Sequence, residues 1–566
     1  MCGISGMFLK HLFTKYQLTN LQFAFFAASR KLDHRGPDRS QCIILSDPIN
    51  AMIDFKRLSI MDTSTQGDQP FIYDDGDRTV YVMCNGEIYN YNDLCKDHDL
   101  HPMSGSDCEV IPLLYKKYGM SYMHTLCNSL NSEHAFMILD VDRLTGDYVM
   151  CLSNDRFGVR PLFTAQTDDA FYFASELAGL PCLDDLGAVV ERFEPRHYAI
   201  LEKKDGVLGK LVYHKYFDFN DVVLEISESI ADEPLEDQCS QLEYLLTDAT
   251  VIRLTSDRPY GCLLSGGVDS SLVAALAAKH LKQFEKRLRT FSIGMDGGTD
   301  EKFAKMVAEY IDSDHTHITV TEDEFTDSIL NVVKTIGSFD ITSVRASVGQ
   351  YQISKWISEN TDIKVLLCGD GSDEICGSYK YFHNAPSSKD FHNECIRLLS
   401  DIHKYDGLRA DRCISYFGIE ARFPFLDHRF VTYYLSCDPV IRQPQNGVEK
   451  WLLRMSFEKS HILPNAVLFR SKEAFSDGVS SQKRSWYQIV QEKANAIYTD
   501  EEYETKKLAY EHCQPISKES LLFRETFCQT YGINKTVSQT IPYYWLPKWC
   551  GNIVEPSARV LKVYSN

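Results

Sequence analysis

The sequence is poor in basic residues and has no apolar run long enough to cross a membrane. Its 59 Lys and Arg stand against 79 Asp and Glu, which gives a formal net charge of −20. A surface this acidic disfavours nucleic acid and anionic membranes as partners. Lys10 and His11 interrupt the first apolar stretch, so no secretory signal is predicted and we expect a cytoplasmic protein.

Cysteine patterns that bind metals are also missing. The 18 cysteines form no Cys-x-x-Cys pair and no Cys/His spacing typical of zinc sites, so zinc is not expected. Several of them, such as Cys151, Cys262 and Cys368, lie in apolar runs, where a reduced thiol packs as a small hydrophobe. The chain also lacks internal repeats, and its 566 residues predict more than one globular domain.

The two halves of the chain have different patterns. In the first half, short apolar runs broken by Gly, Asp and Asn, as at 80–84 and 148–152, predict a sheet-rich domain. A stretch rich in Asp and Glu follows at 218–236. We therefore predict a first domain over residues 1–205, a linker over 206–236 and a second domain over 237–566.

In the second half, predicted strands alternate with predicted helices. Such alternation indicates a parallel sheet covered by helices, in which ligands bind at the carboxyl ends of the strands. A capping box formed by Thr321 and Glu324 predicts the start of a further helix. The predicted strands are 260–264, 289–295, 315–320 and 364–368, and the predicted helices are 268–280 and 300–311.

The string LSGGVDSS at 264–271 lies between a predicted strand and a predicted helix. Gly266 and Gly267 let backbone N–H groups close on an anion, and the helix adds its positive end. Asp269 would repel a phosphate unless a divalent cation lies between them, so Mg²⁺ is implied. Ser-Gly-Gly alone is more often a plain turn, but the whole string in this context favours a pyrophosphate site. It is not a Walker loop, because the GxxxxGK[ST] spacing is absent.

A second candidate site begins at the N-terminus. Once the initiator methionine is removed, Cys2 would carry a thiol and a free α-amine, which makes it a nucleophile with its own base. The Asn85 side chain and the Gly86 N–H are candidate donors to an oxyanion, and Arg57 suits a substrate carboxylate. Each residue alone is more often a turn or surface group. The residues that suit a substrate ammonium are Glu87 and Asp107.

The strings around these residues, such as DHRGPD at 33–38 and NGEIYN at 85–90, resemble the glutaminase domain of class II glutamine amidotransferases. These are N-terminal-nucleophile hydrolases. The resemblance implies an α+β domain with the αββα fold of that class, and hydrolysis of the side-chain amide of glutamine. The catalytic residues that it implies there are Cys2, Asn85 and Gly86, and the implied glutamine ligands are Arg57, Asn85, Gly86, Glu87 and Asp107.

The string at 264–271 resembles the pyrophosphate loop of N-type ATP pyrophosphatases, which implies a Rossmann-like α/β domain.

Nearly the whole chain resembles the glutamine-hydrolysing asparagine synthetases, through DRFGVRPL at 155–162, GIEARFPFLD at 418–427 and KEAFSDG at 472–478. The family implies three small-molecule substrates, glutamine, aspartate and ATP. It also implies β-aspartyl-AMP as intermediate and ammonia passed between two active sites. The sequence alone does not give the oligomeric state, and a homodimer is one possibility.

Motif matches to this family assign the residues of the second site. The implied ATP and pyrophosphate ligands are Leu264, Ser265, Gly266, Gly267, Asp269, Ser270, Ile293, Cys368, Gly369, Asp370, Asp373 and Lys472. The implied ligands of aspartate or the intermediate are Thr342, Arg345, Arg409 and Arg422, and the implied Mg²⁺ ligands are Asp269 and Asp373. Asp370 stands where the family usually has Glu, so a carboxylate that could take a proton from the attacking ammonium is set back by a methylene.

Two other interpretations remain open on the sequence. One is a carboxylate-activating ligase similar to β-lactam synthetases, but such relatives generally lose the N-terminal site that this chain keeps. The other is a catalytically weakened relative that only binds glutamine or nucleotide, for which Asp370 is the best argument. An assay with Cys2 replaced by alanine separates these interpretations.

Overall fold

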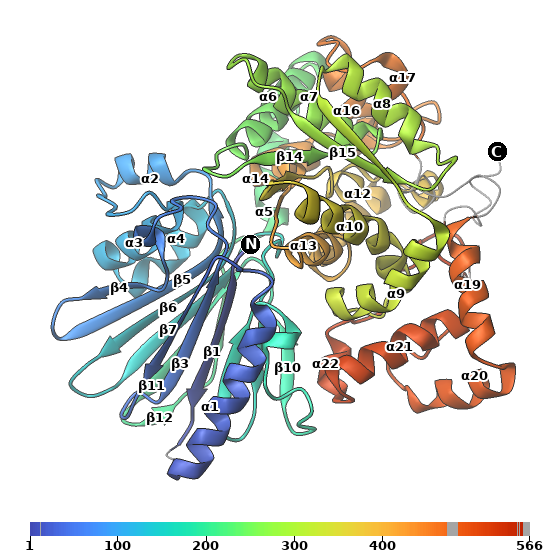
Figure 1. Cartoon of the computed structure of the whole chain (residues 1–566). Coiled ribbons are helices and arrows are strands. Elements are labelled where there is room, and N and C mark those ends of the chain that lie inside the picture. The colour runs from blue at the N-terminus through green and yellow to red at the C-terminus, as the bar shows by residue number, and fades with distance from the viewer. Residues whose placement is uncertain (12, 473–484, 552, 554, 558–566) are drawn as a thin grey trace. The chain divides into compact units, whose positions relative to one another are not determined.

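Residues 1–11, 13–472, 485–551, 553 and 555–557 are described by a computed structural model, in which the chain forms two units (Figure 1). The first unit comprises Met1–Asp218, Ser415–Ile419 and Cys528–Thr540. The second comprises Phe219–Ile414, Glu420–Phe527 and Ile541–Asn566. Of the KEAFSDG string, only Lys472 lies within the described residues.

Two antiparallel sheets form the centre of the first unit. Their strand orders are β10-β8-β9-β1-β3-β2 and β12-β11-β7-β6-β5-β4, and β13 pairs with β11. The first sheet contains β1 Gly3–Leu9, β2 Arg39–Leu45, β3 Ala51–Arg57, β8 Phe163–Gln166, β9 Ala170–Ala174 and β10 Val189–Arg192. The second contains β4 Phe71–Asp74, β5 Arg78–Ile88, β6 Ser132–Asp142, β7 Tyr148–Asn154, β11 His197–Lys204, β12 Val207–Leu208 and β13 Val212–Lys215.

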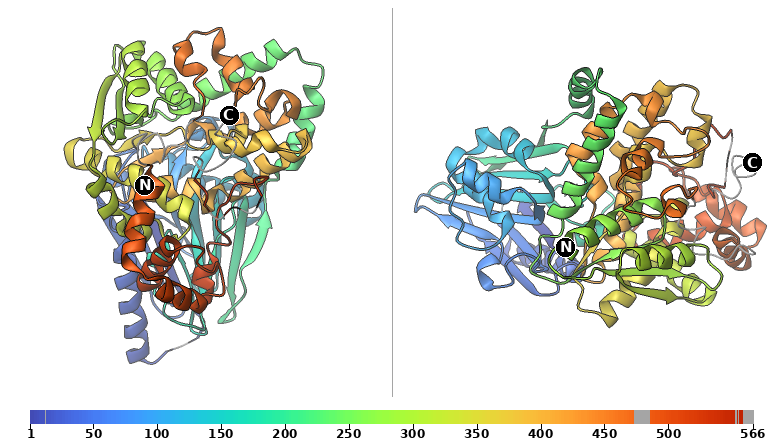
Figure 2. Two further views of the ribbon diagram at one scale, coloured as in Figure 1. Left: turned by 90° about the vertical axis from the view of Figure 1, so that its right-hand side faces the viewer. Right: turned by 90° about the horizontal axis from the view of Figure 1, so that it is seen from above.

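The sheets of the first unit pack face to face and carry helices on their outer faces (Figure 2). One core contains Ile4 and Phe8 of β1 together with Met83 of β5 and Met137 of β6. All seven residues of β1 are buried, and α1 Lys15–Ser29 buries Phe25, Ala28 and Ser29 near its C-terminal end. The helices α2 Tyr91–Asp97, α3 Val110–Tyr118 and α4 Met123–Ser129 accompany the second sheet. This confirms the predicted αββα arrangement.

The second unit contains a five-stranded parallel sheet, of order β16-β15-β14-β17-β18. The predicted strands and helices are confirmed to within a few residues, because short apolar runs between polar turns mark them clearly. The strands are β14 Tyr260–Leu263, β15 Arg289–Gly294, β16 Asp314–Thr319, β17 Val365–Leu367 and β18 Glu420–Arg422. The connecting helices are α7 Val268–Lys282, α8 Asp300–Tyr310, α9 Glu322–Ile336 and α10 Ile341–Asn360.

The path of the chain through this sheet changes direction beside β14. The connections through α7 and α8 step outward from β14 to β15 and β16, whereas the chain then returns through α9 and α10 to β17. Because such crossovers are right-handed, α7 and α8 lie on one face and α10 lies on the other, as Figure 1 shows. The carboxyl ends of β14 and β17 therefore flank a topological switch point, where ligands bind in sheets of this kind.

The predicted capping box at the start of α9 is confirmed. The Glu324 N–H donates to the Thr321 hydroxyl at 3.2 Å, and the Thr321 N–H donates to the Glu324 carboxylate at 2.8 Å. Each interaction satisfies a backbone donor that the first turn of the helix cannot satisfy by itself.

Helices make up most of the rest of the second unit. They are α5 Phe219–Ser229, α6 Leu235–Ile252, α11 Ser372–Cys376, α12 Ser388–Asp401, α13 Asp406–Ser415, α14 His428–Ser436, α15 Pro439–Arg442, α16 Trp451–Glu458 and α17 Asn465–Leu468. The last part of the chain, for which the sequence predicted no structure, adds α19 Trp486–Ile497, α20 Asp500–Lys506 and most of α21 Lys518–Tyr531 to this unit, whereas α22 Lys535–Gln539 belongs to the first unit. Within the described residues, no helix combines the length and the apolar character needed to span a bilayer.

Candidate active sites

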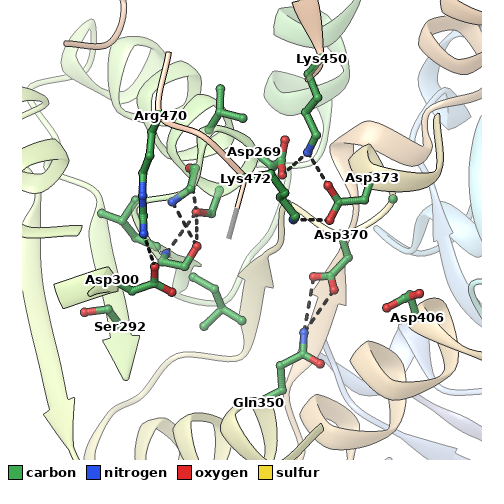
Figure 3. Close-up of a pocket in the computed structure, with 18 of the residues that line it drawn as sticks. Asp269, Ser292, Asp300, Gln350, Asp370, Asp373, Asp406, Lys450, Arg470 and Lys472 are labelled. Atoms are coloured by element: carbon green, nitrogen blue, oxygen red, sulfur yellow. Dashed lines mark hydrogen bonds and ion pairs between the residues drawn. The ribbon is translucent and has the colours of Figure 1, made fainter. Parts of the chain in front are cut away.

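A pocket lies at the carboxyl ends of β14, β15 and β17, and we call it the strand-end pocket (Figure 3). The structure brings most of the predicted residues of the second site together there. Those that line it are Leu264, Ser265, Gly267, Asp269, Ser270, Ile293, Gly369, Asp370, Asp373, Arg409 and Lys472.

The glycine loop forms one wall of this pocket. The Ser265 N–H donates to the Ser270 hydroxyl at 3.1 Å, which ties the loop to the first turn of α7. Gly266 has a φ of +79°, and a Cβ there would lie 2.5 Å from the Ala304 backbone nitrogen, so only glycine fits. Gly266 supports the loop from behind and does not line the pocket.

Two carboxylates and two lysines form an ionic network at the same end of the pocket (Figure 3). The Lys450 ammonium lies 2.6 Å from Asp373 and also pairs with Asp269. Lys472 pairs with the other oxygen of Asp373, and the Ser372 hydroxyl donates to Asp269 at 2.7 Å. Lys450 is 1% exposed and was missed in the sequence, where it precedes an ordinary amphipathic helix without a motif.

This network controls the charge of its members. Burial acts to raise the pKa of Asp373, but the ammonium groups of Lys450 and Lys472 outweigh it and hold that pKa far below its usual range. Burial acts to lower the pKa of Lys450, whereas the charges of Asp269 and Asp373 raise it well above its usual value. Asp373 and Lys450 are therefore both charged at neutral pH.

The same carboxylates fit Mg²⁺ that arrives with a nucleotide. Asp269 and Asp373 share one ammonium ion, so the space between them is already suited to positive charge. Mg²⁺ is commonly held by one or two carboxylates together with phosphate oxygens and water. Among the described residues, no group of three or more His, Cys, Asp or Glu could hold a metal ion by itself.

The far side of the pocket carries a pair that the sequence did not indicate. Arg470 donates to the Gly266 carbonyl at 3.1 Å and to Asp300 at 2.8 Å, and its guanidinium lies 4.1 Å from the centre of the Phe303 ring. Ser292 of β15 also lines this side. These contacts hold the glycine loop against the start of α8.

Four of the predicted residues with polar or thiol side chains lie outside the strand-end pocket. Arg345 pairs with Glu519 at 2.5 Å and with Glu555 at 2.5 Å, so the guanidinium is occupied by two carboxylates. The Thr342 hydroxyl donates to a backbone carbonyl at 3.2 Å. The other two are Arg422, which is fully buried and pairs with Glu420 at 2.8 Å, and Cys368, which is buried at the end of β17.

In the first unit, Cys2 directly precedes β1. Its thiol lies 3.6 Å from the Leu58 carbonyl, and its own carbonyl accepts a hydrogen bond from Arg35 at 2.9 Å. Arg57 ends β3 next to Leu58, and its guanidinium donates to the Ser64 carbonyl at 2.7 Å. The structure therefore places the predicted nucleophile against the backbone of the residue that follows Arg57, whose guanidinium also pairs with Asp68 at 2.5 Å.

The other predicted residues of this site lie on β5 and in the turn Asp107–Glu109. Asn85 is fully buried, and neither polar atom of its side chain has a hydrogen-bond partner among the described residues. Gly86 has no room for a side chain, because a Cβ would lie 2.0 Å from the Glu133 carbonyl oxygen. Asp107 accepts a hydrogen bond from the Ile88 N–H at 2.6 Å, which ties its carboxylate to the backbone of the residue after Glu87.

Gln69 lies between Arg57 of β3 and the residues of β5, and the sequence analysis did not identify it. It lines a cavity together with Arg57, and its side-chain carbonyl accepts a hydrogen bond from the Cys84 N–H at 2.7 Å. Cys84 directly precedes Asn85 on β5. A lone glutamine between loop residues carries no motif, so only the contact itself reveals it.

Comparison with known proteins covers both units. A glutamine amidotransferase domain family matches residues 1–205, and the asparagine synthase family matches residues 241–392 and 384–532. The glutamine-hydrolysing asparagine synthetases of Cricetulus griseus and Homo sapiens are each 38% identical over 583 residues, which covers 100% of this chain and 99% of the relative. The enzyme of Gallus gallus is 37% identical with the same coverage. The chain belongs to the family of glutamine-hydrolysing asparagine synthetases.

Proposed function

We propose that this protein makes asparagine from aspartate, with glutamine as nitrogen donor and with cleavage of ATP to AMP and pyrophosphate. The observation that carries the proposal is the strand-end pocket, in which a glycine loop, two carboxylates and two lysines converge beside a helix N-terminus. Such an arrangement suits an ATP triphosphate, because backbone donors and cations meet at one point.

The two reactions are assigned to successive domains of the chain. We propose a glutaminase domain over residues 1–205, a linker over 206–236 and a synthetase domain over 237–566. A homodimer and a cytoplasmic location stay predictions, which sedimentation and cell fractionation can test.

In the glutaminase, the Cys2 thiolate attacks the side-chain amide carbon of glutamine. The oxyanion that forms accepts hydrogen bonds from the Asn85 amide and the Gly86 N–H. Support comes from the Asn85 side chain, which is buried and has no hydrogen-bond partner among the described residues. Collapse of this intermediate releases ammonia and leaves a thioester, which water hydrolyses to glutamate. The glutamine backbone is held by Arg57, Glu87 and Asp107.

In the synthetase, the β-carboxylate of aspartate attacks the α-phosphorus of ATP, the α–β bond breaks, and pyrophosphate leaves. Lys450 and Lys472 offer their ammonium groups to the departing anion, and Ser265 and Ser270 add hydroxyl donors. Mg²⁺ held by Asp269 and Asp373 would supply charge neutralisation for the phosphates. Of the four residues assigned to the aspartyl group, Arg409 lines the pocket.

In the second step, ammonia attacks the acyl carbon of β-aspartyl-AMP, and the bond to the AMP phosphate oxygen breaks. The nitrogen becomes positively charged as it attacks, so it must lose a proton to complete the amide. The Asp370 carboxylate is the proposed acceptor of that proton. Burial raises its pKa, which Arg409 partly offsets, and a raised pKa makes the carboxylate a stronger base.

The experiment compares two nitrogen sources in a Cys2→Ala variant. We expect asparagine synthesis from glutamine to be lost and synthesis from added ammonium to remain, because only the first site needs the thiol. Cys42→Ala, at an exposed cysteine of β2, is the matched control and should retain both activities. If the wild-type protein forms no asparagine from either source, with ATP, Mg²⁺ and aspartate present, the proposal is wrong.

A further inference from the structure

Gln350 of α10 reaches into the strand-end pocket and contacts the proposed base (Figure 3). Its side chain is 5% exposed. The amide nitrogen lies 3.3 Å from one oxygen of Asp370 and 3.5 Å from the other. The amide oxygen accepts a hydrogen bond from Arg409 at 2.9 Å. One side chain therefore contacts both charged groups that face the reacting position.

Arg409 closes this arrangement into a triangle. Its Nη2 atom lies 3.1 Å from Asp370, its Nη1 atom donates to Gln350, and its Nε atom donates to Asp406 at 2.8 Å. A guanidinium prefers to grip a carboxylate with two parallel N–H groups. Gln350 and Asp406 accept hydrogen bonds from its Nη1 and Nε atoms, and its ion pair with Asp370 runs through Nη2.

The chemistry of an amide explains why glutamine fits this position. A glutamine donates through its nitrogen and accepts through its oxygen, whereas a glutamate has no donor at neutral pH and a methionine has neither group in useful strength. Gln350 can thus hold a carboxylate and a guanidinium together. No other uncharged residue among those that line the pocket is shown in contact with both.

We propose that Gln350 is a positioning residue for the amide-forming step: it orients the Asp370 carboxylate and keeps Arg409 from gripping both of its oxygens. The inference rests on the proposed function and deepens it. The contact at 3.5 Å is long, so the nitrogen that becomes positively charged during the attack can displace it at that oxygen. In the step, the nitrogen–carbon bond forms, the bond to AMP breaks, and one proton moves from nitrogen to the freed carboxylate oxygen.

This role makes a specific prediction about the two halves of the synthetase reaction. Formation of β-aspartyl-AMP does not need a base at Asp370, whereas amide formation does. Gln350→Met keeps the size of the side chain and removes both hydrogen bonds. We expect kcat for synthesis from ammonium to fall about tenfold, a part of what a general base contributes. The KM values for ATP and aspartate, and aspartate-dependent exchange between ATP and pyrophosphate without a nitrogen donor, should stay within about twofold.

Two further variants separate positioning from simple loss of structure. Gln350→Asn keeps a donor and an acceptor with shorter reach, so it should recover part of the lost kcat. Gln352→Met is the matched control, because Gln352 lies on the same helix but its amide donates to the Glu324 carbonyl at 2.9 Å, outside the pocket. That control should leave kcat and exchange unchanged.

The outcomes distinguish this inference from the proposed function. An unchanged kcat in Gln350→Met, or an exchange rate that falls as much as kcat, overturns the positioning role. Equal activity of Gln350→Met and Gln350→Asn also overturns it, because the hydrogen bonds would then not matter. A wild-type protein that makes asparagine from ammonium in the same assay shows that such a failure concerns Gln350 alone.

Discussion

The two candidate sites hold their polar groups in opposite ways. In the antiparallel first unit, Asn85 lies on a strand with its side chain buried and without a hydrogen-bond partner among the described residues. In the parallel second unit, Asp269, Asp373 and Lys450 lie in or beside helix starts and neutralise one another. Under the proposed function, the first site stabilises a charge that appears during the reaction, whereas the second exchanges internal ion pairs for pairs with its ligand.

This contrast follows from the architecture. A strand buried between layers can place a side chain in a dry, rigid setting. An oxyanion is stabilised by one or two hydrogen-bond donors held in such a setting. Loops at the ends of parallel strands place many backbone donors and side chains around one space, which suits a large, highly charged ligand. The contrast predicts that substitutions in the first site change activity more than stability, and that substitutions in the second change both.

The largest effect is expected for Lys450→Met. Removal of the ammonium leaves Asp269 and Asp373 without their shared cation, which should cost about 3–5 kcal/mol of stability, as broken buried pairs do. We expect synthesis from ammonium to fall about 10³-fold, because the departing pyrophosphate loses a donor. Chemical denaturation and an asparagine assay measure the two effects, and glutamine hydrolysis should persist.

Lys459→Met is the control for charge removal. Lys459 is 75% exposed and pairs with Glu236 at the surface, so its loss should leave the denaturation midpoint nearly unchanged. Equal stability losses in both lysine variants would contradict the ion network as a structural element of the second site.

A smaller effect, confined to activity, is expected for Asn85→Ala. Loss of an oxyanion donor should lower glutamine hydrolysis about 10²- to 10³-fold. Stability should change by no more than about 1 kcal/mol, because no hydrogen bond within the described residues is broken. Glutaminase kinetics and thermal melting check both values.

Asn90→Ala sharpens this test. Its amide donates to the Ser129 carbonyl at 2.8 Å and accepts from the Asn131 N–H at 2.9 Å, so the protein should lose stability while hydrolysis changes little. If Asn85 instead proves important for stability and Asn90 for activity, the assignment of the unpaired amide to activity and the paired amide to stability is wrong.

Gly266→Ala should mainly affect folding of the second unit. The new Cβ would lie 2.5 Å from a backbone nitrogen in a left-handed conformation, which we expect to cost about 2 kcal/mol. Gly267→Ala is the matched control, since its Cβ meets nothing closer than the Ser265 hydroxyl at 3.4 Å. If the two variants unfold at the same denaturant concentration, the tight packing of the loop on α8 is not as described.

The smallest effect is expected for the two capping boxes. Thr321→Ala on α9 and Thr14→Ala on α1 should each cost about 1 kcal/mol at pH 7. The box of α9 uses Glu324, whose pKa is lowered by hydrogen bonds from the Thr321 N–H and hydroxyl, whereas that of α1 uses the neutral Gln17. A lowered folded-state pKa gives stability that is present above the unfolded pKa and is lost as pH falls.

Stability curves at several pH values test this last difference. The cost of Thr321→Ala should shrink as pH falls below about 4, near the usual range of glutamate, while that of Thr14→Ala stays constant. Parallel pH dependence of both variants would show that the Glu324 carboxylate does not contribute to the cap.

Sequence reasoning succeeded where the signal is local. Apolar runs predicted β14, β15 and β16, and the spacing of Thr321 and Glu324 predicted the start of α9. It also assembled most of the strand-end pocket, because motifs after β14 and β17 had to meet at one sheet edge. It made no prediction for the helical end of the chain, although α19 begins with a capping box formed by Ser485 and Gln488.

Three of the residues assigned to aspartate or the intermediate, Thr342, Arg345 and Arg422, do not line the strand-end pocket, and their role stays a prediction. A motif match gives the neighbourhood of a residue, but the direction of its side chain depends on which face of the helix or strand it occupies. Arg345 and Arg422 are each buried against carboxylates, an environment that no local spacing reveals.

By itself, the sequence determined the order of strands and helices, the glycine loop and the chemistry of the reactive groups, because periodicity, capping and backbone freedom act over a few residues. The tertiary structure alone decided which charges meet. Lys450 reaches Asp269 across 181 positions of sequence, and Gln350 reaches Arg409 across 59. Such contacts depend on how a whole sheet brings its strand ends together, so they became visible only in the folded chain.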